Sequence, residues 1–294
     1  MKKDYKISVI IPFLNTKKEY ISRCLRSINN QTYKNFECFV IDDGSDNKET
    51  IDYVAKICTV YKNFSYIKLD NNQGIGYARN VGFDKSTGQI IVFVDSDDML
   101  IPSALEVINT QFSENDLDIL VFNVWRLTNW HLYEVTKIKQ DSSVTNLALD
   151  NELITQTQSA WAKAYKKQYL LDNKIRHLDK KLYMEDLYFF FLNLSRAKKI
   201  KIIKEKIYVS RNTENSLLNT SVTDSRLKDI IYNYAMAYKD TKNDYSELSN
   251  NFDKYMNYSL HEVLEIIKLD PKDKQLQSKL LGFFNEIKDK ILRQ

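Results

Sequence analysis

The chain has little of several residue types that interrupt regular structure or build covalent frameworks. Its 294 residues include only six glycines, three prolines and three cysteines. So few glycines and prolines argue against a long disordered linker. The cysteines are odd in number and have no C-x-x-C spacing, so we expect structural thiols in a reducing cytosol rather than a disulfide framework. These three residues are Cys24, Cys38 and Cys58.

Long apolar runs and a strong net charge are absent as well. No run approaches the roughly 18 apolar residues that suggest a membrane span. Residues 7–14 are apolar, but the run is short, contains Pro12 and lacks a small-residue cleavage site, so we expect a first strand rather than a signal peptide. A net charge of +4 is too small to imply a nucleic-acid partner. With 43% hydrophobic residues, the chain can bury the core of one large domain, with or without an extension.

The most informative stretch covers residues 88–98. Residues 90–94 form a short, continuous apolar run rich in β-branched side chains, which is typical of a strand buried on both faces. The run ends in Asp95, Ser96, Asp97 and Asp98. Three carboxylates at one strand end repel each other unless a positive group lies among them, and Mg²⁺ or Mn²⁺ with a diphosphate would suit the cluster. The alternative is an acidic turn that caps a helix starting near Pro102.

Strands alternate with helices through the first half of the chain. Residues 8–13, 36–41 and 66–69 are expected as strands, and helices are expected at 18–29, in the 50s and at 77–85, which indicates βαβ units and a mostly parallel sheet. Asp42 and Asp43 follow the second strand as Asp95 and Asp97 follow the central one. Parallel strands bring these ends to one edge, where open α/β sheets bind ligands. Here Asp43 can accept from a base N–H and Asp95 from a ribose hydroxyl, unless residues 42–45 are only a capping turn.

Gly74, Gly76 and Arg79 come shortly before the central strand. The Gly-x-Gly pair lacks the third glycine of a dinucleotide-binding motif, so it indicates only close backbone approach. Arg79 is expected either to contact a phosphate or to pair with Asp95.

Two later stretches also carry chemistry. Trp161 is a core residue or a ligand contact, and Lys163 is a phosphate or acceptor contact or a solvated lysine. Glu185 and Asp186 precede a strongly apolar helix. The helix dipole alone would favour carboxylates there, but one of them can also act as a general base toward a sugar hydroxyl.

The C-terminal region differs in composition from the rest of the chain. From about residue 225 it is helical in pattern and rich in Lys and Tyr, and residues 280–292 carry an apolar stripe at helical spacing. The stripe is interpreted as packing on the main domain, as a dimer contact or as a membrane-surface helix.

Taken in order, these pieces resemble the family 2 glycosyltransferases of the GT-A fold. Each piece is weak alone, but the ordered set is specific and covers about residues 5–216. The matching pieces are residues 8–12 with Asn15, residues 31–37, residues 42–45, residues 72–74 with 78–80, Gly88 with residues 95–98, Trp161 with Lys163, and Glu185 with Asp186.

The resemblance implies an α/β fold of GT-A type, with a single Rossmann-like, mostly parallel central sheet flanked by helices. It implies inverting, metal-dependent transfer of a hexose or N-acetylhexosamine from a UDP-sugar to a hydroxyl. Asp97 would bind Mn²⁺ or Mg²⁺. Asp186 would be the general base, with Glu185 as the next candidate, and Trp161 would meet the acceptor. The donor site would comprise Pro12, Asn15, Asp43, Gly74, Arg79, Asp95, Ser96, Lys163 and Arg211.

The resemblance also implies an organisation and a setting. Residues 1–220 would form the catalytic domain, and residues 221–294 a helical extension for acceptor binding, self-association or membrane approach. The acceptor would be a glycan or glycolipid of a bacterial capsule or other surface polymer, or a glycoprotein glycan. The enzyme would work in the cytoplasm, at the inner face of the membrane if it meets a lipid carrier, and its C-terminal helices could form a homodimer.

Two other functions are considered. The first is a non-catalytic nucleotide-sugar-binding or scaffold subunit that assists a partner transferase; intact Asp97 and Asp186 argue against it. The second is a sugar nucleotidyltransferase, which would need a Gly-rich basic loop after the first strand, and residues 13–17 contain no glycine.

Overall fold

The computed structural model describes residues 3–128, 131–134, 138, 140–144, 159–212 and 224–241. The chain forms two compact units. The first comprises Met1–Asn146, Ser159–Lys181 and Ala197–Asn212, and the second comprises Leu147–Gln158, Leu182–Arg196 and Thr213–Gln294. The chain therefore enters the second unit three times. The domain boundary expected at residue 220 lies outside the described residues.

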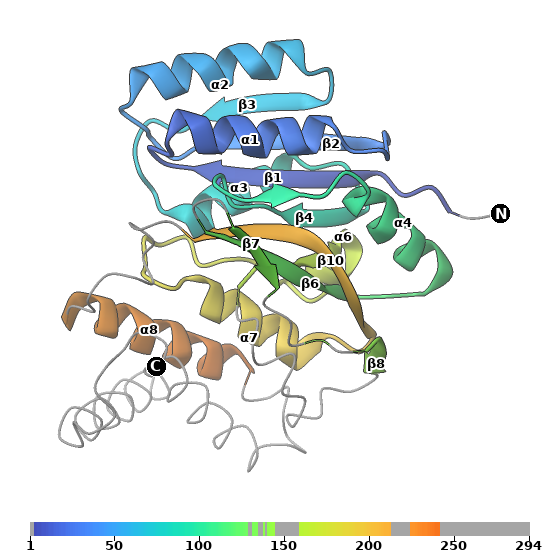
Figure 1. The fold of residues 1–294 in the computed structure, drawn as a ribbon. Coiled ribbons are helices and arrows are strands. Elements are labelled where there is room, and N and C mark those ends of the chain that lie inside the picture. Colours follow the sequence, from blue (N-terminus) through green and yellow to red (C-terminus); the bar gives the residue numbers. More distant parts are fainter. Residues whose placement is uncertain are drawn as a thin grey trace. The chain divides into compact units, whose positions relative to one another are not determined.

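The first unit is built on one ten-stranded sheet (Figure 1). Eight strands lie in a continuous path, and two more pair at its side: β7 (His131–Glu134) with β6, and β8 (Ser142–Val144) with β10. The path runs β3 (Phe64–Lys68), β2 (Phe36–Asp42), β1 (Ile7–Phe13), β4 (Ile90–Phe93), β9 (Lys163–Lys166), β6 (Ile119–Thr128), β10 (Ile200–Asn212) and β5 (Met99–Leu100).

Strand directions decide which residues share an edge of this sheet. The pairs β1–β2, β1–β4, β2–β3 and β6–β10 are parallel, whereas β9 is antiparallel to both of its neighbours, β4 and β6. Because β9 reverses the direction once on each side, β6 and β10 run the same way as β4. The carboxyl ends of β1, β2, β4, β6 and β10 therefore meet at one edge, together with the amino end of β9.

Helices bury the apolar surfaces of this sheet. The helices α1 (Lys18–Asn29), α2 (Lys48–Val60) and α4 (Ala104–Glu114) share one apolar cluster with alternate residues of β1. In α1 the buried positions are Ile21, Cys24, Leu25 and Ile28, which is the spacing of one helix face. The remaining β1 residues point to the opposite face. On that face α3 (Ile75–Lys85) lies so close that a Cβ on Gly82 would be 2.5 Å from Ile10 Cγ2.

These observations confirm the expected α/β fold with a central sheet flanked by helices. The short helix α6 (Lys167–Asp172) follows β9 directly. The sequence did not predict β9.

In the second unit, α7 (Asp186–Arg196) packs against α8 (Asp224–Thr241). The rings of Phe191 and Tyr234 lie 5.1 Å apart, and Tyr188 Oη donates a 2.7 Å hydrogen bond to Asp240 Oδ2. Among the described helices, none has both the length and the apolar character needed to cross a bilayer. The apolar stripe of residues 280–292 lies outside the described residues.

Candidate active site

The two aspartates at the end of β2 have separate partners. Asp42 is fully buried, and its carboxylate accepts hydrogen bonds from Ser45 N and Tyr66 Oη, each at 2.7 Å. Asp43 is also buried and accepts from Gln73 N at 2.8 Å and Gly74 N at 2.9 Å. Burial raises the pKa of the Asp43 carboxyl, and the two N–H groups partly oppose that rise. Asp42 thus shapes its own turn, whereas Asp43 holds the loop that leads into α3.

Asn15 joins the loops that follow β1 and β2. Its backbone is left-handed, with φ of 50°, a conformation that asparagine adopts more readily than most residues. Its Oδ1 accepts from Asp46 N at 3.0 Å and from Asn47 N at 3.3 Å, and its own N–H donates to Ser45 Oγ. Pro12 is buried within β1, opposite Ile41 of β2. Pro12, Asn15 and Asp43 thus lie at one corner of the edge, where the ends of β1 and β2 are joined by a 2.9 Å hydrogen bond from Asp43 N to the Phe13 carbonyl.

We call residues 95–98 the acidic loop, and its first carboxylate is neutralised by the protein. Arg79 Nη2 lies 2.9 Å from Asp95 Oδ1, and the Arg79 side chain is only 1% exposed. Of the two roles considered for Arg79, the structure shows the pairing with Asp95. Ser96 is buried at the edge, where its hydroxyl shares a 2.6 Å hydrogen bond with that of Thr16.

The last carboxylate of the acidic loop is held by β10. Asp98 is 3% exposed and accepts hydrogen bonds from Tyr208 Oη at 2.6 Å and from Arg211 N at 2.7 Å. Burial raises the pKa of Asp98 well above its usual range, and the charges of Asp97 and Asp95 add to the effect. The Tyr208 hydroxyl also accepts from Asp95 N at 3.2 Å, so one oxygen ties the two ends of the loop.

Asp97 differs from both neighbours. Its side chain is half-buried, and no other residue in the described part of the chain donates a hydrogen bond to its carboxylate. Burial raises the pKa of Asp97, and the positive charge of Arg211 opposes the rise. Arg211 Nε donates to the Asp97 carbonyl at 3.0 Å, and the guanidinium lies 4.7 Å from the centre of the Tyr20 ring. Asp97 is thus the carboxylate of the loop that is available to a ligand.

The donor atoms at Asp97 fit a hard divalent cation that completes its shell from the substrate. Mg²⁺ typically keeps several waters and is bound by one or two carboxylates plus substrate phosphates. Within the described ranges there is no cluster of three or more His, Cys, Asp or Glu side chains that could enclose a metal. The carboxylate of Asp97, at the end of β4, is therefore the protein ligand that would be available to Mn²⁺ or Mg²⁺ here.

The predicted contacts from β9 reach the same edge. The Trp161 ring stacks on the Tyr208 ring, with centroids 5.1 Å apart and planes at 16°. Lys163 is 4% exposed, and its ammonium donates to the Ser159 carbonyl at 2.7 Å. Both residues are near the amino end of the antiparallel strand, which is why a segment so distant in sequence joins the acidic loop.

Glu185 and Asp186 belong to the second unit. Asp186 is the first residue of α7 and is half-buried, whereas Glu185 is buried with 9% exposure. The first unit therefore gathers the predicted donor and metal residues, and the second unit carries both candidate bases.

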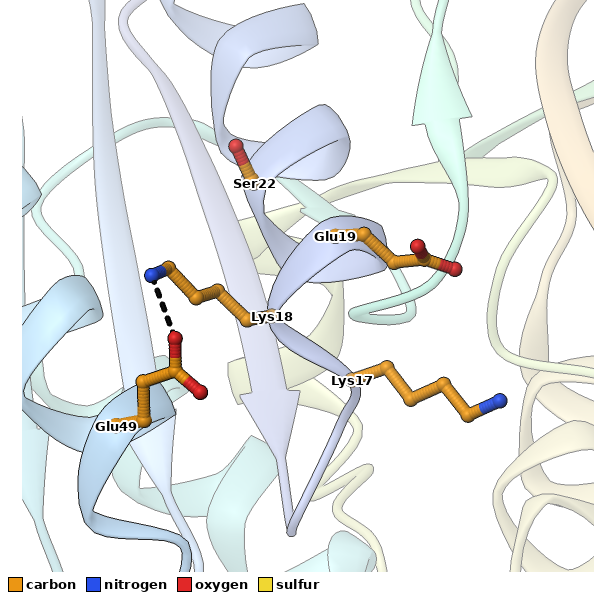
Figure 2. A pocket seen from close by; sticks show the side chains of 5 residues that line it. All are labelled: Lys17, Lys18, Glu19, Ser22 and Glu49. Carbon is orange, nitrogen blue, oxygen red and sulfur yellow. Dashed lines mark hydrogen bonds and ion pairs between the residues drawn. The ribbon is translucent and has the colours of Figure 1, made fainter.

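A hollow of about 490 Å³ lies at the start of α1 (Figure 2). Lys18 crosses it to pair with Glu49 at 2.8 Å. Its lining contains none of the predicted site residues, and its two lysines are balanced by two glutamates. It is lined by Lys17, Lys18, Glu19, Ser22 and Glu49.

Sequence reasoning missed Tyr208, Thr16 and Tyr20. Tyr208 lies between Ile207 and Val209 in an apolar strand, where the sequence pattern predicts only that its ring is buried. No local pattern reveals its hydroxyl contacts, because its partner Asp98 lies 110 residues earlier in the chain.

The strand order β3-β2-β1-β4, with polar loops at the carboxyl ends, is that of a Rossmann-like α/β protein. A family model described as "Glycosyl transferase family 2" matches residues 8–171. The chain belongs to this family and is a glycosyltransferase.

Relatives and solved structures agree with this assignment. Glycosyltransferase GlyG of Streptococcus pneumoniae is 28% identical over 249 residues, which cover 76% of this chain and 77% of GlyG. Glycosyltransferase GlyA of the same organism is 31% identical over 217 residues, 61% of this chain but 30% of GlyA. The crystal structure of S. aureus TarS 1-349 in complex with UDP-GlcNAc aligns with a TM-score of 0.79 at 23% identity, covering 96% of this chain and 81% of TarS. The likeness to TarS shows the GT-A fold.

Proposed function

We propose that this glycosyltransferase moves a hexose or N-acetylhexosamine from a UDP-sugar to a hydroxyl of a glycan acceptor, with inversion and with the help of Mn²⁺ or Mg²⁺. The observation that carries the proposal is the acidic loop, where protein groups engage Asp95 and Asp98 while Asp97 stays available at the carboxyl end of β4. The TarS structures with UDP-GlcNAc and with UDP support the choice of donor.

In this proposal the corner of Pro12, Asn15 and Asp43 receives the nucleoside. Asp43 keeps acceptor capacity toward a base N–H, because a carboxylate has about four lone-pair sites and two are used here. Gly74 supplies backbone at the same place. Its φ of 101° suits glycine, and a Cβ there would be 2.8 Å from Lys181 Cα.

The other donor-site residues face the sugar and the phosphates. Asp95 and Ser96 lie on the ribose and sugar side, with Arg79 fixing Asp95. The positive charges of Arg211 and Lys163 favour the diphosphate. When bound at Asp97, the divalent ion supplies positive charge opposite the diphosphate leaving group.

Asp186 is the proposed general base. Asp186 takes the proton of the acceptor hydroxyl as that oxygen attacks the anomeric carbon and the bond to the diphosphate breaks. Attack from the side opposite the leaving group inverts the configuration. We choose Asp186 over Glu185 because Glu185 is the more buried of the two.

The acceptor belongs to the same proposal. Trp161 offers a half-buried aromatic face suited to a sugar ring. We propose a lipid-linked capsular or other surface glycan, or a glycoprotein glycan, as acceptor, with the enzyme in the cytoplasm or at the inner face of the membrane. Homodimer formation through the C-terminal helices is part of this proposal.

The test is UDP release from a panel of UDP-sugars, with Mn²⁺ and with a chelator. We expect one donor to be turned over only with metal. In Asp97→Asn that turnover should fall by about a hundredfold or more with an unchanged melting temperature, since one oriented electrostatic group contributes on this scale. Asp186→Asn should bind UDP with the affinity of the parent enzyme while turnover collapses.

Lys18→Gln is the matched control, because it removes a charge from the hollow at α1 and should leave turnover unchanged. Metal-independent turnover, or Asp97→Asn at the parent rate, would contradict the metal role. UDP binding by calorimetry without release, even with glycan acceptors supplied, would favour the scaffold subunit. No binding of any uridine nucleotide would refute the donor class.

A further inference from the structure

The turn before Asp186 has an unusual backbone. Met184 has φ of 55°, in the left-handed region that a long side chain rarely occupies. Leu187 N donates to the Met184 carbonyl at 3.1 Å, so the turn leads directly into α7. A strained conformation of this kind persists only where neighbouring groups hold it. The groups that hold this one lie on α8.

Asn233 of α8 makes two contacts with the turn. Its Nδ2 donates to the carbonyls of Tyr183 at 3.0 Å and Met184 at 3.2 Å. Asn233 is fully buried, and its Oδ1 has no hydrogen-bond partner among the described residues. An apolar side chain would avoid burying that oxygen. The residue is therefore suited to its two donated bonds rather than to packing.

Asp229 holds the same turn from one helical turn earlier. Its Oδ2 accepts from Tyr183 N at 3.1 Å. Asp229 and Asn233 are four residues apart and so share one face of α8. Arg226 adds a cation–π contact, 4.9 Å from the centre of the Tyr183 ring. Three hydrogen bonds with α8 thus hold the Tyr183 N–H and the carbonyl groups of Tyr183 and Met184.

We propose that Asn233 and Asp229 are positioning residues for the general base, acting through the Tyr183–Met184 turn to orient Asp186. The inference rests on the proposed role of Asp186. In this proposal α8 contributes to catalysis indirectly, because its contacts with the turn set the direction in which α7 begins.

Orientation of the base affects the chemical step and not donor binding. A loss confined to kcat, with KM for the donor retained, is the signature of an interaction needed in the transition state. Small misplacements of a catalytic group reduce rates by up to about a hundredfold. A purely structural role would lower stability without this split.

The experiment measures UDP release from the active UDP-sugar of the panel, beginning with UDP-GlcNAc, together with UDP affinity by calorimetry. In Asn233→Leu, which keeps the branched shape of the side chain and removes the donors, we expect kcat to fall about 10- to 100-fold while KM and UDP affinity change less than about twofold. Tyr188→Phe is the matched control. It removes one bond between the same two helices, to Asp240, without touching the turn, and should keep the parent kcat.

A second pair of variants covers the case in which Asn233→Leu fails to fold. Asp229→Asn keeps an acceptor for Tyr183 N and should retain kcat, whereas Asp229→Leu should lose it. An unchanged kcat in Asn233→Leu, or equal losses in Asn233→Leu and Tyr188→Phe, would overturn the inference, as would equal rates in the Asp229 pair.

The double variant separates this inference from the proposed function. If Asn233 acts through Asp186, adding Asn233→Leu to Asp186→Asn should cause no further loss, because two residues that act as a unit are non-additive. Additive losses would refute the coupling while leaving Asp186 as the base. Full activity in Asp186→Asn would instead refute the base assignment of the proposed function.

Discussion

Asp95, Asp97 and Asp98 are the same side chain within four residues, and their partners make them different. Arg79 neutralises Asp95, and the Tyr208 hydroxyl with Arg211 N engages Asp98. The Asp97 carboxylate accepts no hydrogen bond from another residue in the described part of the chain. The number of acidic residues in the loop therefore does not distinguish them. What distinguishes Asp97 is that its carboxylate has no hydrogen-bond donor from another described residue.

Tyr208 is the residue through which this arrangement is most easily tested. In Tyr208→Phe the buried Asp98 loses a donor and the Asp95 N–H loses its acceptor. We expect unfolding free energy to fall by about 1–3 kcal/mol, the usual penalty for unpairing buried polar groups. We also expect the Mn²⁺ concentration for half-maximal UDP release to rise about tenfold, which corresponds to about 1.4 kcal/mol of weaker binding.

Tyr165→Phe is the control, because it removes another buried tyrosine hydroxyl, bonded to the Ala160 carbonyl at 3.0 Å. It should lower stability and leave the Mn²⁺ requirement alone. If both variants shift the metal requirement equally, Tyr208 has no special link to the acidic loop.

At the scale of elements, the two ends of the sheet have different tasks. At the amino ends, Glu37 of β2 accepts from Ser8 Oγ of β1 at 2.6 Å, pairs with Lys6 at 2.6 Å and accepts from Gly88 N just before β4 at 3.1 Å. One carboxylate thus fastens three strands. The carboxyl ends carry loops whose polar groups serve the site.

Glu37 should make stability depend on acid. Burial alone would raise its pKa, but hydrogen bonds from Lys6, Ser8 and Thr87 outweigh burial and lower the pKa from 4.5 to about 2. The contribution of Glu37 is therefore fully present above pH 4.5 and lost as pH falls toward 2.

We expect Glu37→Gln to be less stable than the parent by about 1–2 kcal/mol at pH 7, a value discounted for the solvent exposure of Lys6. The difference between the two proteins should shrink from pH 4.5 to 2 in denaturant unfolding. A constant difference across that interval would show that the Glu37 charge is irrelevant to folding.

Local periodicity predicted the elements that lie near one another in sequence. The helix expected at 18–29 is observed as Lys18–Asn29, and the strands expected at 8–13 and 36–41 are each extended by one residue. β9 was not predicted, because Lys163–Lys166 is short, has a lysine at each end and becomes a strand only by pairing with β4 and β6. Pairing over such separations leaves no trace in a local pattern.

The motif residues show the same limit within the site. Chemistry at strand ends was predictable, but the division of labour between Asp42 and Asp43 was not. Their roles differ because the Asp42 carboxylate accepts a hydrogen bond from Tyr66, whereas the Asp43 carboxylate accepts one from Gly74 N in the loop before α3. Gln31 belongs to the residues that carry the resemblance. Its side-chain amide donates to the Ile101 carbonyl and accepts from Leu105 N, so it stabilises the start of α4.

At the scale of the whole molecule, the chain passes between its two units repeatedly. After α7 of the second unit it forms β10 of the first, and it then returns to the second unit, which contains α8. A chain ending after Asn212 lacks α8, which packs on α7. We expect such a chain to bind the dye ANS and to aggregate, because uncovered apolar side chains such as Phe191 associate. ANS fluorescence and light scattering measure this. A chain ending after Thr241 should bind less dye, and equal dye binding by the two chains would contradict the prediction.

The hydrogen-bond partners of the acidic loop lie far from it in sequence, so they are synthesised later. Tyr208 and Arg211, which donate to Asp98, follow it by 110 and 113 residues. At ordinary rates of translation that interval lasts on the order of ten seconds. During that interval the acidic loop of the nascent chain lacks its hydrogen bonds from β10. The enzyme becomes competent late in its own synthesis, after the ribosome has delivered the strand that closes the site.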